Sequence, residues 1–184
     1  MNKTRTYIIC TLAIVLFVWP AITLATSRVR AVTPSALIIP KLGINATIEA
    51  RGQSWSGRML RPTMARRVAW YRDGTIPGQP GKAVMYGHLT DNSFHPAIFS
   101  QLNKLRRNDR VYVTDISGNT HVFRVTSRST YRANEPPLRQ IMGPTRYIQL
   151  NLYTCAGKWD AKTQNYTHYL VVYTAFVKSL AAKK

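Results

Sequence analysis

Cysteine is scarce in this chain of 184 residues, which contains only two. Cys10 lies in an apolar N-terminal stretch, and Cys155 lies in a polar surrounding far along the chain. A disulfide between them would tie the N-terminal stretch to the rest of the protein, so we expect none. A small scaffold held together by several disulfides is excluded, and Cys155 is expected to be a lone thiol.

Acidic residues are also few, with 7 Asp and Glu against 26 Lys and Arg. Residues 1–30 hold four basic residues and no acidic one, so the rest of the chain carries 22 basic and 7 acidic residues, a net charge of +15. A surface of this charge suits polyanions such as anionic lipid headgroups or acidic wall polymers. The basic residues are scattered between candidate strands without a nucleic-acid-binding motif, so we expect no nucleic-acid partner.

Motifs for metals and nucleotides are lacking as well. The four histidines and the single cysteine beyond the N-terminal stretch show no zinc-ligand spacing, and no two acidic residues lie close enough in sequence for a calcium loop. The stretch 72–81 is rich in glycine and proline but contains neither GxGxxG nor the Lys-Ser/Thr of a phosphate-binding loop. We therefore expect no metal and no cofactor.

Only one long apolar run is present, residues 7–25, and it holds no charged residue. Nineteen such residues can span a bilayer, and Lys3 and Arg5 before them favour a cytoplasmic N-terminus, residues 1–6, with the rest of the chain outside the cell. The alternative is a signal peptide cleaved after Ala25. Residues 26–35 are expected to be a polar tether and residues 179–184 a basic tail, on either side of a domain over residues 36–178.

The domain reads as all-β. Ser117-Gly118-Asn119 indicates a hairpin turn between two alternating segments, and Pro96 begins a pattern over 96–105 that predicts one short helix. Short strands at regular spacing with a single helix are typical of a closed or nearly closed β-barrel. The expected strands are 35–40, 46–49, 83–86, 110–115, 120–131, 147–154 and 168–177, with a further apolar segment at 68–71.

Cys155 and His88 each follow the end of an apolar, strand-like run. Leu150 and Leu152 alternate with polar residues before Cys155, and the run 83–86 ends directly before Gly87 and His88. One thiol and one imidazole at two strand ends suggest a nucleophile with its acid-base partner. The plainer interpretations are an inert core cysteine and a surface-loop histidine.

Several motifs, in the right order over most of residues 37–177, resemble the sortase family. Residues 39–44 resemble its opening I-P-x-I-G-V segment, Pro77-Gly78 through Gly87-His88 resemble its PGxxG and GH segment, and residues 152–155 resemble the end of its T-L-x-T-C signature. Asn151 stands where the signature has its first threonine. Trp70-Tyr71 and residues 156–160 look most like the class F branch.

This resemblance implies an eight-stranded barrel and a cysteine transpeptidase that acts as a monomer. Its Cys155 would attack an LPxTG-like sorting signal of a secreted protein between Thr and Gly and form a thioester. His88 would protonate the leaving amine and deprotonate the incoming amine of the cell envelope.

One departure from the family concerns its arginine on the strand after the cysteine. Aligning residues 171–173 with that strand places Thr167 at the arginine position, and a shift by one residue places His168 there instead. Neither side chain is a permanent bidentate donor. The transition state would then be supported by Thr167 or His168, or by an arginine from elsewhere, such as Arg128 or Arg132.

Other functions stay open at this point. A different exported cysteine enzyme, such as an L,D-transpeptidase, should have a glycine-rich stretch before the cysteine, where this chain has Thr154. A non-catalytic or weakly hydrolytic envelope-binding protein on the same barrel would explain both the basic surface and the missing arginine. A protease-like hydrolase is the third alternative, and it would not transfer the acyl group to an amine.

Overall fold

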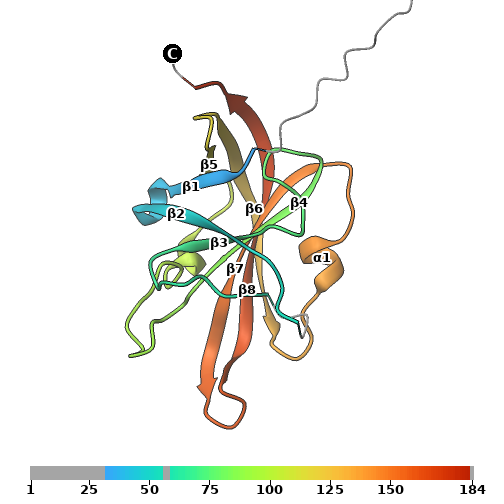
Figure 1. Ribbon diagram of the computed structural model, residues 1–184. Coiled ribbons are helices and arrows are strands. Elements are labelled where there is room, and N and C mark those ends of the chain that lie inside the picture. Colours follow the sequence, from blue (N-terminus) through green and yellow to red (C-terminus); the bar gives the residue numbers. More distant parts are fainter. Residues whose placement is uncertain (1–31, 56–58, 183–184) are drawn as a thin grey trace, which may run out of the picture. The chain divides into compact units, whose positions relative to one another are not determined.

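The computed structural model describes residues 32–55 and 59–182 (Figure 1). The strands in these ranges are β1 (Pro34–Ile39), β2 (Ile44–Arg51), β3 (Val68–Tyr71), β4 (Gly81–Gly87), β5 (Arg110–Asp115), β6 (Thr120–Arg132), β7 (Ile148–Asp160) and β8 (Asn165–Leu180). The helices are all short: the 3-10 helices η1 (Pro40–Leu42) and η2 (Leu102–Lys104) and the α-helix α1 (Leu138–Met142).

Within the described residues the eight strands close into a barrel, in the order β1-β2-β3-β4-β7-β8-β6-β5. Two neighbouring pairs are parallel, β2 with β3 and β4 with β7, and the other pairs are antiparallel. In Figure 1, β7 and β8 form the orange and red pair whose hairpin lies at the bottom of the view. The prediction of a closed, mainly β barrel is confirmed.

The alternation along each strand sorts side chains between the barrel interior and its outer face. Ala83 and Met85 of β4, like Leu150 and Leu152 of β7, are fully buried in a core to which every strand contributes. The residues between them point the other way. On that side a second cluster, here called the outer cluster, covers β3, β4, β7 and β8 with α1 packed against it; its members include Tyr71, Val84, Tyr86, Ile141, Tyr153 and Val171.

The prediction of a helix over residues 96–105 is wrong. Only η2 is helical there, and the residues before it form turns. The backbone N–H groups of Ser100, Leu102 and Lys104 each donate to the carbonyl three residues back, at 3.1, 3.1 and 2.9 Å, which is the 3-10 and turn pattern and not the α-helical one. The apolar face of the segment is nevertheless buried in the core, as the spacing of Phe99, Leu102 and Leu105 indicates.

The region 136–144, which lies between two of the expected strands, contains α1. Its five residues follow two prolines, and Ile141 packs into the outer cluster against β4. The Asn151 side chain of β7 donates to the Ile141 carbonyl at 2.6 Å, which fixes the helix on the outer face of the barrel. A single helical turn carries too little periodicity to be seen in sequence.

The apolar run 7–25 lies outside the described residues. Within the described ranges no helix has the length and apolar character needed to cross a membrane.

Candidate active site

The parallel ladder of β4 and β7 ends next to two of the candidate site residues. Tyr86 of β4 pairs with Tyr153 of β7, the last pair of the ladder, and both rings lie in the outer cluster. Cys155 lies two positions further along β7, and side chains two positions apart in a strand share a face, so the thiol is on the side of Tyr153. His88 lies two positions after Tyr86, just beyond the end of β4 at Gly87, so both candidate residues follow the last pair of the ladder.

A side-chain hydrogen bond joins β7 to the last residue of β4 at this point. Thr154 Oγ1 donates to the Gly87 carbonyl at 2.9 Å, and the Thr154 side chain is 1% exposed. Thr154 and Gly87 directly precede Cys155 and His88, so this bond sets how far apart the two candidate residues lie.

Replacing Thr154 with valine is expected to destabilise the fold by about 1–3 kcal/mol, because the buried Gly87 carbonyl loses its donor. Urea unfolding of the purified chain measures the change. Thr130→Val is the matched control, since Thr130 is an exposed residue of β6, and we expect it to change stability by less than about 0.5 kcal/mol. Equal midpoints for the two variants would contradict this assignment.

The sequence suggested that Cys155 follows the end of a strand, and this prediction is wrong. Cys155 lies within β7 and pairs with Tyr169 of β8, while its β4 side is no longer covered by the ladder. The strand continues past it through a bulge at Gly157, whose φ of 78° suits glycine. The thiol is a free, half-buried group on a well-supported strand with one open side.

Burial is the main influence on the Cys155 thiol and raises its pKa above the ordinary value of 9.0. The positive charge of Arg61 and a hydrogen bond from the Cys155 backbone N–H work in the opposite direction and offset part of the rise. At neutral pH the thiol is therefore mainly protonated. A reaction that starts from the thiolate can therefore begin only in the minority of molecules whose Cys155 is deprotonated.

The His88 ring is fixed by a hydrogen bond to the backbone of another loop. Its Nε2 lies 3.1 Å from the Pro62 carbonyl, and because a carbonyl only accepts, Nε2 is the donor. In the neutral ring the proton is then on Nε2, and Nδ1 is free to accept one. The backbone carbonyl of His88 accepts from Phe99 N, which holds the following loop in place.

The structure brings together the two residues that sequence alone left open near the family's arginine position. Tyr169 of β8 pairs with Cys155, and Thr167 and His168 precede it on the same strand, with both side chains beside Gly157. The Thr167 hydroxyl already accepts from Lys158 N at 3.0 Å and lies 2.8 Å from His168 Nδ1. Neither residue brings a permanent positive charge to the thiol.

The two arginines named as alternatives lie on β6, which neighbours β8 and is separated from β7 by it. Arg132 pairs with His168 of β8. Arg128 donates from Nη1 to the Leu105 carbonyl at 3.3 Å. The positive charge that does act on Cys155 belongs to Arg61, in the loop between β2 and β3. Sequence reasoning missed it, because this loop has no periodic pattern and its place is set by long-range hydrogen bonds.

An aromatic cluster connects the segment after His88 with the β7–β8 hairpin. The Trp159 ring makes edge-to-face contacts with Phe94 at 5.6 Å and with Tyr166 at 5.4 Å, measured between ring centroids. The hydroxyls of Thr90 and Tyr166 are 2.7 Å apart. These contacts join the two segments that carry His88 and Cys155 on the side away from the Thr154 bond.

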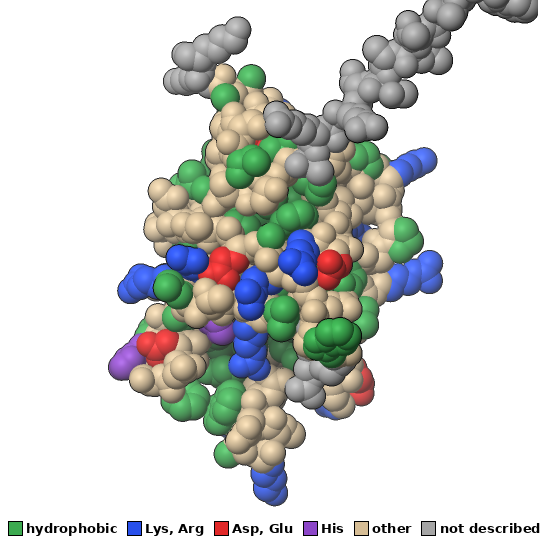
Figure 2. Space-filling model, in the orientation of Figure 1, with side chains coloured by type: hydrophobic (Ala, Val, Ile, Leu, Met, Phe, Trp, Pro, Cys, Tyr) green, Lys and Arg blue, Asp and Glu red, His purple; other side chains and the backbone are tan. Residues whose placement is uncertain are grey.

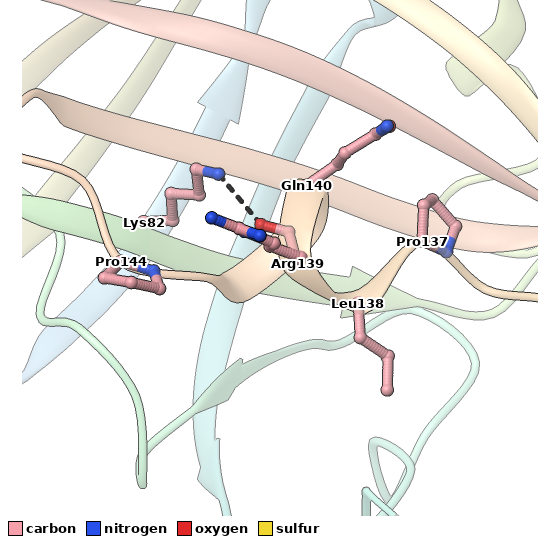
Figure 3. A pocket seen from close by; sticks show the side chains of 6 residues that line it. All are labelled: Lys82, Pro137, Leu138, Arg139, Gln140 and Pro144. Carbon is pink, nitrogen blue, oxygen red and sulfur yellow. Dashed lines mark hydrogen bonds between the residues drawn. The ribbon is translucent and has the colours of Figure 1, made fainter.

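A shallow hollow lies at the opposite end of β4 (Figure 3). Lys82 donates from Nζ to the Arg139 carbonyl at 3.1 Å across it. Its volume is about 480 Å³, and it is lined by Lys82, Pro137, Leu138, Arg139, Gln140 and Pro144. None of the candidate site residues lines it, so it is separate from the thiol and the imidazole.

Comparisons with known proteins agree with this fold. The family model described as "Sortase domain" matches residues 37–177. No curated protein sequence matches the chain. Among solved structures, sortase A of Listeria monocytogenes has a TM-score of 0.61 at 19% identity, covering 84% of this chain and 92% of its own.

Two further structures show the same fold. A pilus-related sortase C of Group B Streptococcus has a TM-score of 0.61 at 18% identity, over 79% of this chain and 68% of its own. A lid mutant of sortase A from Corynebacterium diphtheriae has a TM-score of 0.62 at 18% identity, over 79% and 70%. At these identities the likeness concerns the fold.

Proposed function

Because this chain belongs to the sortase family, whose members are cysteine transpeptidases, we propose that it cleaves an LPxTG-like sorting signal and transfers the acyl group to an amine of the cell envelope. The observation that carries the proposal is the position of Cys155 and His88, each two residues beyond the last pair of the β4–β7 ladder. A thiol beside an imidazole is the arrangement that covalent acyl transfer requires.

The proposed reaction has two halves. The Cys155 sulfur attacks the carbonyl carbon between Thr and Gly of the sorting signal, and the carbon–nitrogen bond breaks as a thioester forms. Protonated His88 gives its Nδ1 proton to the leaving amine. In the second half an envelope amine attacks the thioester, Nδ1 takes up its proton, and the carbon–sulfur bond breaks to return the Cys155 sulfur.

The pKa of Cys155 leads to a pH prediction. Because the pKa is raised above 9.0, the rate of Cys155 alkylation by iodoacetamide should still be rising at pH 9 and reach half its maximum above that pH. Mass spectrometry of the chain alkylated for fixed times between pH 6 and pH 11 measures the profile. A half-maximum below pH 8 would show that burial does not control this thiol.

Product analysis tests transfer against hydrolysis. The full chain in mild detergent is incubated with a library of LPxTG-like peptides, with and without an added glycine peptide as the amine. We expect products joined to the added amine, formed at the expense of the free acid. Free acid alone at every amine concentration would support a hydrolase instead.

The alternative is a non-catalytic or weakly hydrolytic envelope-binding protein on a sortase barrel. The observation in its favour is the lack of a permanent cation at Thr167 and His168 of β8. A peptide vinyl sulfone, which reacts with an active thiolate, separates the two functions. Labelling at Cys155 supports the transpeptidase, and a chain that binds the peptide without labelling supports the binding protein.

The surroundings of the enzyme are part of the proposal. We propose that residues 7–25 anchor the chain in the cell membrane with the barrel outside the cell, where secreted proteins with sorting signals and envelope amines would meet it. In Figure 2 basic side chains lie at several separate places on the visible face, which suits a location near anionic polymers better than a nucleic-acid groove.

We also propose that the protein acts as a monomer. The finer assignment to class F rests on Trp70, Tyr71 and residues 156–160.

A further inference from the structure

The loop between β2 and β3 passes over the outer face of the barrel beside the candidate active site. Its described part from Met59 to Arg67 is here called the covering segment. The Tyr86 hydroxyl donates to the Leu60 carbonyl at 2.7 Å, and His88 Nε2 donates to the Pro62 carbonyl at 3.1 Å. Arg61 lies between these two anchored residues, so its backbone is held next to Tyr86 and His88.

The covering segment is also fastened at its other end. The Glu49 carboxylate accepts from Thr63 N at 3.0 Å and from Arg67 Nη1 at 3.1 Å, and Ile98 N donates to the Ala65 carbonyl. Burial works to raise the pKa of Glu49, but the hydrogen bonds from Thr63 and Arg67 outweigh it and lower the pKa below 4.5. Near neutral pH the carboxylate is charged and the segment is held in one place.

Arg61 itself is an exposed side chain on this fixed backbone. Its charge acts on two groups of the outer face, Cys155 and Tyr153, and in both cases it favours the negatively charged form. The titratable strand neighbours of the thiol are Tyr153 on β7 and Tyr169 on β8, and His88 is the acid-base partner assigned to it in the proposed reaction. Of these, only the imidazole can become a cation, and in the proposed reaction its proton is given away.

We propose that Arg61 supplies the positive charge that stabilises the Cys155 thiolate and then the oxyanion of the tetrahedral intermediate, in place of an arginine on β8. This inference rests on the proposed transpeptidase function. The guanidinium carries five N–H donors and keeps its charge throughout, so no bond to Arg61 forms or breaks. Arg61 belongs to the β2–β3 loop, and the backbone of this loop is held in place by the hydrogen bond between the His88 ring and the Pro62 carbonyl.

The test compares Arg61→Gln and Arg61→Lys with Arg66→Gln, an exposed arginine of the same covering segment, all in the full chain. The first measurement is Cys155 alkylation by iodoacetamide against pH. We expect Arg61→Gln to move the half-maximum to higher pH, Arg61→Lys to move it less, and Arg66→Gln to leave it unchanged. Identical profiles for Arg61→Gln and Arg66→Gln would overturn the inference, whatever the peptide substrate.

The second measurement is peptide transfer at saturating amine. Loss of a donor to the oxyanion is worth about 100- to 1000-fold in kcat, so Arg61→Gln should lose this much with little change in KM, and Arg61→Lys should recover part of it. Since Arg61 is exposed, we expect the unfolding midpoint of all three variants to match the parent chain. If the parent transfers the acyl group and Arg61→Gln has the same kcat, the role of Arg61 is refuted and the proposed function stands. If the parent itself forms no acyl product, the proposed function fails first.

Discussion

Replacing Cys155 with alanine is expected to lower acyl transfer by about 10⁴- to 10⁶-fold, because the reaction then has no nucleophile. The expectation follows from the fold: within the described residues Cys155 is the free thiol, it is half-buried, and its strand is open toward His88. The measurement is the initial rate of amine-linked product from the best peptide of the library, for the variant and the parent chain.

The matched control is Cys10→Ala, which removes the other cysteine of the chain and leaves the proposed machinery intact. We expect the parent rate from it. Unfolding curves of both variants confirm that neither has lost the fold, since alanine at 155 leaves the pairing of β7 with β8 in place. Transfer by the Cys155→Ala chain at more than about 1% of the parent rate would assign the nucleophile elsewhere.

Replacing His88 with glutamine is expected to reduce transfer by about 10²- to 10⁴-fold, the usual loss when a positioned proton donor and acceptor is removed. Glutamine is chosen because its amide N–H can still donate to the Pro62 carbonyl, so the covering segment keeps its anchor. The amide cannot exchange a proton at neutral pH, so the two proton transfers assigned to His88 Nδ1 are lost. The measurement is kcat and KM for transfer, together with the pH profile of kcat.

His95→Gln is the control for this variant. His95 lies in the loop after His88, its side chain is 76% exposed, and its Nδ1 contacts the Asp91 carboxylate at 3.4 Å. We expect the parent kcat and the parent pH profile from it. If both variants lose the same activity, the histidines act through loop structure, and His88 is not the proton carrier.

The barrel was predictable because its signal is local. Leu150 and Leu152 alternate with polar residues, and the structure buries both completely in the core. The sequence also suggested that the strands before His88 and Cys155 belong together, and the structure pairs β4 with β7. It did not show that this pair is parallel, because no local pattern contains the register between two strands.

The failed predictions concern details of backbone hydrogen bonding and side-chain position that the local pattern does not contain. Residues 96–105 have a helical spacing, but Ser100 N, Leu102 N and Lys104 N each donate three residues back and no α-helix forms. Cys155 seemed to end a strand because Gly157 follows, but that glycine forms a bulge and β7 continues. Arg61 looked like one more loop arginine, and only the bonds of Leu60 and Pro62 to Tyr86 and His88 place it near the thiol.

Mass spectrometry of the acid-quenched chain decides whether Cys155 carries the acyl group. The chain is mixed with a sorting-signal peptide without amine, quenched within seconds, digested and analysed. We expect the mass of the peptide up to its threonine on the fragment that contains Cys155, removed by hydroxylamine as a thioester is, and reduced in the His88→Gln chain. If this fragment stays unmodified while the peptide is cleaved, or if the adduct persists in the Cys155→Ala chain, the Cys155 thiol and the His88 imidazole are not the reacting pair.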